Sequence, residues 1–331
     1  MSGGVPDGGG ITWMDGLSRS GVLKLLIAPS LVALADAWPA SAQNEAVRFA
    51  CGASDVGASG FYALDGGFFR KAGLTAEAVN LANGAAIAAA LISGDLEFGS
   101  INMVALASAR ENGVPFVWVA PNGAYTSQSP TAGMVVSKTS PIRTAKDLEG
   151  KTVAVFLLRQ LADIALHAWL TQNGADPSRL KYVEMSYPAM ATGLASGRID
   201  AACFEEPILT QTLAANGRLL AYGYSAIAPL FCEGAWVTSA AYAKNNPEIV
   251  KKFADAIAMT ADWANANHAA SMKILEKYSN APLPPGMHYC YFPKRLNVAE
   301  FQPVIDAAAR FGVIKAPFNV TEMFAAGVGA T

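Results

Sequence analysis

Residues 47–81, VRFACGASDVGASGFYALDGGFFRKAGLTAEAVNL, decide the fold class of this chain. The first five residues alternate at period two, which predicts a strand, and Gly52 then opens a loop. The sequence next predicts a helix over 61–71 and a second strand over 74–81. A strand, a helix and another strand joined by short polar connections indicate an α/β fold with parallel pairing.

Predicted strands and helices continue to alternate along most of the chain. The first series runs to residue 120, and a second series begins after a loop at 125–131 that is rich in Ser, Thr and Pro. In the second series, apolar residues of the helix predicted over 161–171 fall on one face. The C-terminal part is predicted to be mainly helical. Two α/β series followed by returning helices predict two lobes with a ligand cleft at the carboxyl ends of their strands.

Composition and charge exclude several classes of function. The chain has 331 residues, of which 52% are hydrophobic and 15% charged, and its formal net charge is −2. This is the composition of a globular protein, and it lacks the basic clusters that hold nucleic acid. The four cysteines form no C-x-x-C pair, and no histidine lies at metal-ligand spacing, so neither a metal nor a cofactor is predicted.

The N-terminal region differs in composition from the rest of the chain. A thin basic region precedes an apolar run from Leu25 to Ala35, which is too short to span a bilayer, and an A-x-A motif follows at Ala40 to Ala42. We predict a signal peptide over residues 1–42, a mature chain starting near Gln43 and export to the periplasm. Met14 is an alternative start, and a buried helix or a membrane anchor is the alternative interpretation of the apolar run.

Several blocks of sequence carry a resemblance to a known family. They are Gly60–Leu74, Ala90–Gly99, Ser140–Ile142 followed by Asp147–Val155, and Gly193–Ala202 with Glu206-Pro207. In their order and spacing, these blocks resemble the solute-binding proteins of the nitrate, sulfonate, taurine and thiamine-pyrimidine-precursor transport family.

The resemblance implies an architecture and a partner. The expected fold is that of type II periplasmic binding proteins, in which two lobes, each a mostly parallel sheet flanked by helices, are joined by two crossover strands. One lobe would comprise residues 43–132 and 232–331, and the other residues 133–231. The expected protein is a monomer and not an enzyme. It would close around a small-molecule ligand, a sulfonate, taurine or nitrate-like compound for example, and deliver it to the permease of an ABC transporter at the membrane.

In the first predicted lobe, candidate ligand-binding residues lie where strands lead into helices. Helix N-termini offer unpaired N–H groups with partial positive charge, and small residues allow a ligand close to the backbone. Each position is equally compatible with an ordinary cap or turn. The candidates are Ser59 and Gly60, then Asn83, Gly84 and Ala85, and then Ser100 and Asn102.

In the second predicted lobe and near the crossovers, the candidates are charged, amide or aromatic residues. Arg159, next to Gln160, would clamp a carboxylate or sulfonate, or else be a solvated first-turn residue. Glu206 would accept a hydrogen bond from an amine or amide, or else act at the hinge. Tyr187 and Trp236 would stack on the ligand or shield it, or else pack in the core.

Two other functions remain open at this point. A sensor would pass ligand occupancy to a membrane receptor instead of a transporter. An enzyme on the same fold, like the pyrimidine-precursor synthases that the family resemblance also includes, would need a catalytic pair, and the sequence contains no motif that pairs a nucleophile with a base.

Overall fold

Strands and helices alternate from residue 45 onward in the computed structural model, which describes residues 45–81 and 83–328. The predicted signal peptide lies outside the described residues. Among the helices that are described, none is both long enough and apolar enough to cross a membrane.

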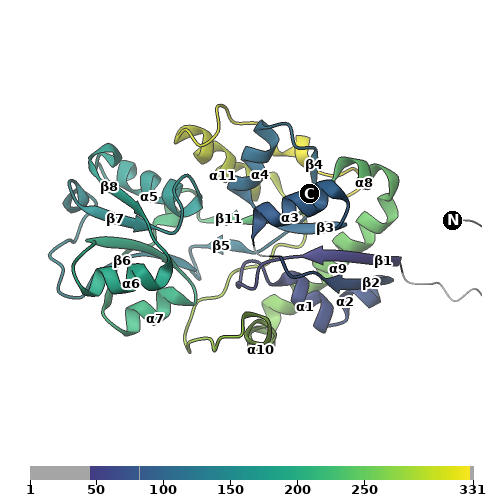
Figure 1. Ribbon diagram of the computed structural model, residues 1–331, viewed down its shortest axis with the longest axis horizontal. Coiled ribbons are helices and arrows are strands. Elements are labelled where there is room, and N and C mark those ends of the chain that lie inside the picture. Colours follow the sequence, from purple (N-terminus) through teal and green to yellow (C-terminus); the bar gives the residue numbers. More distant parts are fainter. Residues whose placement is uncertain (1–44, 82, 329–331) are drawn as a thin grey trace, which may run out of the picture. The chain divides into compact units, whose positions relative to one another are not determined.

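The first sheet has the strand order β2-β1-β3-β12-β4 (Figure 1). Strand β1 pairs in parallel with β2 and β3, whereas β12 is antiparallel to β3 and β4. Four strands therefore run in one direction, and β12, which the chain adds last, runs in the other. The strands are β1 Glu45–Ala50, β2 Leu74–Ala78, β3 Phe98–Asn102, β4 Phe116–Pro121 and β12 Gly234–Ser239.

Helices cover both faces of the first sheet (Figure 1). On one face, the α9 side chain Phe253 stacks on Phe98 of β3 at 3.8 Å and meets Trp236 of β12 edge-on. On the other face, Phe301 of α11 packs on Trp118 of β4. The helices of this part are α1 Ser59–Asp65, α2 Phe68–Lys71, α3 Gly84–Ser93, α4 Met103–Glu111, α8 Ala240–Asn245, α9 Pro247–Ala266, α10 His268–Ser279 and α11 Val298–Arg310.

The prediction of a single helix over residues 61–71 is wrong. The segment forms two helices, α1 and α2, because Gly67 adopts a left-handed conformation with φ 70°. Glycine reaches this conformation without a steric penalty, and a residue there ends the run of helical hydrogen bonds. The break turns Phe68 and Phe69 into the core, where both are buried.

The second sheet has the strand order β10-β6-β9-β7-β8. Strand β7 pairs in parallel with β8 and β9, and β6 is antiparallel to β9 and β10. Four strands again run in one direction, and β6 runs in the other. The elements are β6 Ala132–Ser137, β7 Thr152–Val155, α5 Leu161–Gln172, β8 Lys181–Glu184, α6 Tyr187–Ala195, β9 Ala201–Glu205, α7 Ile208–Ala214 and β10 Gly217–Ala221.

Period-two alternation divides the strands of the second sheet between two apolar clusters. Met134 and Val136 of β6 pack with α5 residues on one face. Val135, between them, packs with α6 and α7 residues on the other. Because successive side chains of a strand point to opposite faces, both faces of this sheet bury apolar surface.

The two sheets are connected by an antiparallel pair of short strands, which we call the crossover pair. These strands are β5 Ala124–Thr126 and β11 Leu230–Cys232. The chain passes through β5 from the first sheet to the second and returns through β11. Tyr125 and Phe231 stack across the pair with ring centroids 5.3 Å apart, and both are fully buried. The structure thus confirms the predicted α/β fold with two connecting strands.

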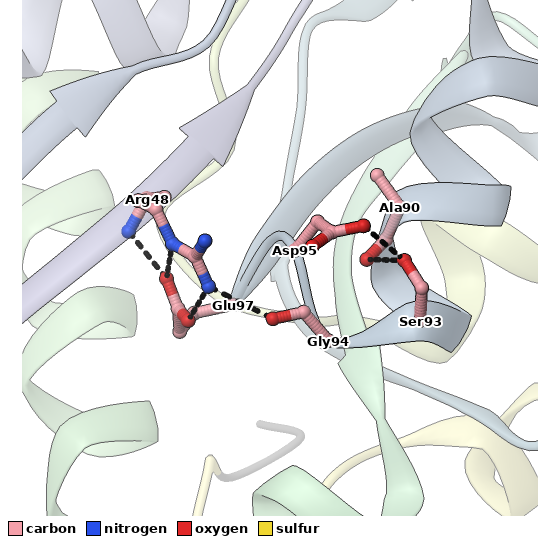
Figure 2. A network of polar contacts seen from close by, with 6 residues as sticks. All are labelled: Arg48, Ala90, Ser93, Gly94, Asp95 and Glu97. Atoms are coloured by element: carbon pink, nitrogen blue, oxygen red, sulfur yellow. Dashed lines mark hydrogen bonds and ion pairs between the residues drawn. The ribbon is translucent and has the colours of Figure 1, made fainter. Parts of the chain in front are cut away.

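A polar network fixes the turn between α3 and β3 to β1 (Figure 2). The Arg48 guanidinium pairs with Glu97 at 2.8 Å and donates to the Gly94 carbonyl. The Ser93 hydroxyl donates to Asp95 at 2.6 Å. The network holds the start of β3 in register, and the carboxyl end of β3 leads into the pocket described next.

Candidate functional site

A pocket of about 240 Å³ lies where strands of both sheets end. Its walls come from the loop after β1, the ends of β3 and β9, the loop between β7 and α5, the start of α6 and the residues that flank the crossover pair. Carboxyl ends of strands are the usual ligand position in open α/β sheets. The lining residues are Ser54, Asp55, Val56, Asn102, Thr131, Phe156, Leu157, Gln160, Leu161, Ala162, Tyr187, Glu205, Glu206 and Glu233.

Asp55 is a buried carboxylate in the pocket wall, with 3% of its surface exposed. Its Oδ2 accepts a hydrogen bond from the Cys290 backbone N–H at 2.7 Å, while its Oδ1 has no hydrogen-bond partner among the described residues. Burial raises the pKa of Asp55 from 3.8 to about 6, although the Cys290 N–H opposes this change.

Glu233 is the second buried acid of the wall, and it follows β11 directly. It is 7% exposed, and its Oε1 has no hydrogen-bond partner in the described structure. Burial raises the pKa of Glu233 well above its ordinary value, and the charges of Glu205 and Asp55 raise it further. The nearby Thr131 hydroxyl is also buried, and no partner for it lies in residues 45–81 or 83–328.

Glu205 and Glu206 complete the acidic wall at the end of β9, and protein groups satisfy both. Glu205 accepts hydrogen bonds from the hydroxyls of Tyr187 and Tyr224. Glu206 accepts from the Thr210 hydroxyl at 2.8 Å and from the Thr210 backbone N–H at 3.1 Å. The pocket lining drawn from the described residues therefore carries four carboxyl groups and no lysine, arginine or histidine side chain.

A neighbouring pocket of about 210 Å³ shares Ser54 and Asn102 with the first. It contains the predicted residues Asn83, Gly84 and Ser100. Asn83 and Asn102 cap helices α3 and α4, each through a side-chain oxygen that accepts a backbone N–H. Asn83 and Asn102 thus act as helix caps, which is the structural alternative that the sequence left open, and both also line a pocket.

Three other predicted or nearby side chains form a buried polar network behind this second pocket. The Trp236 indole donates to Ser59 Oγ at 2.9 Å, and Ser59 donates to Asn122 Oδ1 at 3.0 Å. Asn122 donates in turn to Ser100 Oγ. Trp236 is fully buried and Ser59 is 2% exposed, and both lie outside the linings of the two pockets.

The remaining predicted residues lie outside both pocket walls. Arg159 donates through Nη2 to the carbonyls of Gly312 and Val313, at 3.0 and 2.9 Å, near the end of α11. Gly60 is buried in α1 against Phe49 and Trp236. Ala85 is exposed in the first turn of α3.

The structure brings together four predicted residues in the larger pocket, namely Asn102, Gln160, Tyr187 and Glu206. Sequence reasoning missed Asp55, Glu233 and Glu205. The available signal was an acid at or shortly after the end of an apolar strand. Asp55 lies in the loop after β1, Glu205 is the last residue of β9, and Glu233 follows β11 directly.

Comparison with known proteins finds one relative that is similar in sequence. It is 30% identical over 194 residues to the taurine-binding periplasmic protein of Escherichia coli K12, a match that covers 57% of this chain and 58% of that protein. The chain thus matches less than two thirds of that relative's length.

Solved structures share the fold at lower identity. The periplasmic aliphatic sulphonate binding protein SsuA of Escherichia coli superposes with a TM-score of 0.69 at 17% identity, over 86% of this chain and 98% of that one. The desulfurization enzyme DSZB superposes with a TM-score of 0.66 at 14% identity, over 86% and 97% of the two chains.

A family match covers more than half of the chain. The family described as NMT1/THI5-like matches residues 58–270, which include both sheets apart from β1 and most residues of the larger pocket. The sequence blocks that predicted this relationship lie in or next to the matched range. This chain belongs to the NMT1/THI5-like family.

Proposed function

We propose that this protein is the extracytoplasmic solute-binding component of an ABC importer, and that it captures a small polar organic or anionic ligand in the pocket between its two sheets. One lobe would comprise residues 43–132 and 232–331, and the other residues 133–231. The observation that carries the proposal is that one pocket is lined by strand ends of both sheets, while the crossover pair connects them.

The mechanism that fits this arrangement is hinge closure. A ligand that contacts both walls stabilises the closed form in proportion to its greater affinity for that form. The crossover pair is the natural hinge, because the chain passes between the sheets there. The permease would then recognise the closed form. The similarity to the taurine-binding and sulphonate-binding proteins supports this role.

An enzyme is the second candidate, because the DSZB structure shows that this fold also carries catalysis. Cys51 is a thiol that lines the smaller pocket. Burial raises the pKa of Cys51 to about 12, so it is protonated and a poor nucleophile at neutral pH. This supports binding over catalysis.

The test is a thermal-shift screen of the purified protein against taurine, alkanesulfonates, nitrate, aromatic acids, amines and pyrimidines. A ligand at a hundred times its Kd stabilises the folded state by about 2.7 kcal/mol. Small-angle X-ray scattering with each hit should show a smaller radius of gyration. A hit that is converted to product, or binding without compaction, would contradict the proposed mechanism.

A further inference from the structure

The larger pocket contains two carboxylates whose hydrogen-bonding capacity is unsatisfied. Asp55 Oδ1 and Glu233 Oε1 accept no hydrogen bond of good geometry from the described residues, and both side chains are more than nine-tenths buried. The hydroxyls that face them, Tyr62 beside Asp55 and Thr131 beside Glu233, are themselves without a well-placed partner in the described structure. The neighbouring Thr131 hydroxyl, 4% exposed as a residue, is unpaired within the same part of the chain. Glu205 and Glu206, by contrast, are held by tyrosine and threonine hydroxyls.

Buried unpaired carboxylates are costly to a folded protein. A buried polar atom without a partner destabilises the folded state, and the effect is larger where the group is charged. Here two such groups lie in one wall with two further acids, and the described lining offers no basic side chain to compensate. A partner that binds in the pocket would relieve this cost, and it would need to donate hydrogen bonds and carry positive charge.

We propose that the ligand of this pocket carries a cationic group, such as a protonated amine, an amidinium or a guanidinium, and that Asp55 and Glu233 bind that group directly. This inference rests on the proposed binding function and specifies the ligand class. A simple anion in the same place would face four carboxyl groups without a counter-charge from the described lining.

Part of the pocket lining is apolar and suits an apolar ligand body. Phe156 and Leu157, in the loop after β7, are each 46% exposed, which is high for large apolar side chains. Phe156 stacks on Tyr187 with ring centroids 5.1 Å apart and an interplanar angle of 17°. An organic cation with an aromatic or aliphatic body would cover these side chains and place its charge against the acids.

Proton release on binding is a further consequence. Asp55 faces Tyr62, Cys290 and Glu206, and Glu233 faces Glu205, Asp55 and Thr131, so the described neighbours supply no positive charge that would lower the pKa of either acid. Burial raises the pKa of both acids above their ordinary values, and a bound cation favours their charged forms. The affinity for a cation should therefore rise with pH, and binding should release protons to the buffer.

The experiment compares probe pairs that differ in charge but little in shape. The pairs are benzamidine with benzamide, benzylamine with benzyl alcohol, and the zwitterion taurine with the anion isethionate, measured by titration calorimetry at pH 7.5 in two buffers of different ionisation enthalpy. In at least one pair we expect the member that carries the ammonium or amidinium group to bind about ten-fold tighter or more, as for a hydrogen bond to a charged group. Its apparent enthalpy should change with the buffer.

Two variants and a control identify the residues. Glu233→Gln and Asp55→Asn should each reduce the preference for the cationic member by about ten-fold and diminish proton release. Glu248→Gln, an exposed glutamate in the first turn of α9, should change neither. Because removing a buried acid relieves repulsion, both pocket variants should stay folded, and far-UV circular dichroism checks this.

Several results would overturn the inference. Equal or tighter binding of the members that lack the ammonium or amidinium group, failure of every probe that carries this group to bind, or an undiminished preference in both variants would each do so. If isethionate or another sulfonate binds and compacts the protein while the cations do not, the cationic ligand class is wrong and the proposed transport function stands. If no probe of either kind binds, the proposed function loses its support as well.

Discussion

The buried acids Asp55 and Glu233 make the stability of the unliganded protein depend on pH. The pKa of Asp55 is raised from 3.8 to about 6 by burial, so between these values the folded state holds more protons than the unfolded chain. The free energy of unfolding therefore falls as pH rises through this window and stays low above it. Glu233, raised for the same reason, extends the effect upward.

Asp55→Asn should consequently stabilise the unliganded protein at neutral pH. The expected gain is about 3 kcal/mol at pH 7.5, because each unit of the pKa difference contributes about 1.4 kcal/mol, and it is small at pH 4. Urea denaturation across this pH range measures it. A variant that is less stable than the parent at pH 7.5 would show that Asp55 supports the fold through its contact with Cys290.

Gly60 was a candidate for ligand contact, but its surroundings assign it a packing role. A Cβ at this position would lie 2.7 Å from atoms of both Phe49 and Trp236. Gly60→Ala should therefore lower the free energy of unfolding by about 1–3 kcal/mol, the usual effect of overpacking a core. Gly84→Ala is the control, because a Cβ at Gly84 would meet no described atom within 4 Å, and its effect on stability should be close to zero.

At the scale of elements, the loop between β7 and α5 is tied to the end of α11. Arg159 makes this link through the Gly312 and Val313 carbonyls, and its own backbone lies at φ 59°, with its N–H donating to Asp163 at 2.8 Å. The loop carries Phe156, Leu157 and Gln160 into the pocket. Arg159 therefore positions lining residues, and the ligand clamp expected from the sequence stays a prediction.

Arg159→Ala separates these two roles. If Arg159 positions the loop, the affinity for the charged and uncharged members of a probe pair should fall by the same factor, up to about ten-fold, since two hydrogen bonds are lost. If it clamps an anion, sulfonates alone should weaken. Arg198→Ala, on the exposed turn after α6, controls for the loss of one positive charge. Calorimetry with the probe pairs gives both answers.

The elements themselves were largely predictable, because apolar periodicity sets them locally. The β1 strand and the α5 helix form where the sequence placed them, and the C-terminal part is mainly helical, as predicted. The break between α1 and α2 was missed because two adjacent glycines allow a turn but do not require one. Ser100 lies inside β3 and not at its end, because β3 continues to Asn102.

At the scale of the molecule, the lining of the pocket could not be predicted from the sequence. Asp55, Glu205 and Glu233 belong to segments far apart in sequence, and they meet only because strand order and the crossover pair bring three strand ends to one place. No local motif records this. Family resemblance supplied the fold and pointed to the end of β9 through Glu206, but it did not reveal that the wall is acidic.

The cysteines provide a prediction for the whole fold. All four are free thiols, two of them buried and two half-buried. The midpoint of thermal unfolding should therefore be the same with and without dithiothreitol, within about 1 °C, because no covalent link restrains the unfolded chain. A clear decrease in the reducing agent, seen by scanning calorimetry, would reveal a bridge in the oxidised protein.

The position of β12 has a consequence for biosynthesis. This strand lies between β3 and β4, although the chain makes it only after the entire second sheet. While the polypeptide emerges from the ribosome or a translocation pore, β4 has no neighbour to complete its ladder, and the first sheet stays open along that edge. The first sheet thus cannot be completed until residue 239 has been synthesised, so its folding must wait for the whole of the second sheet.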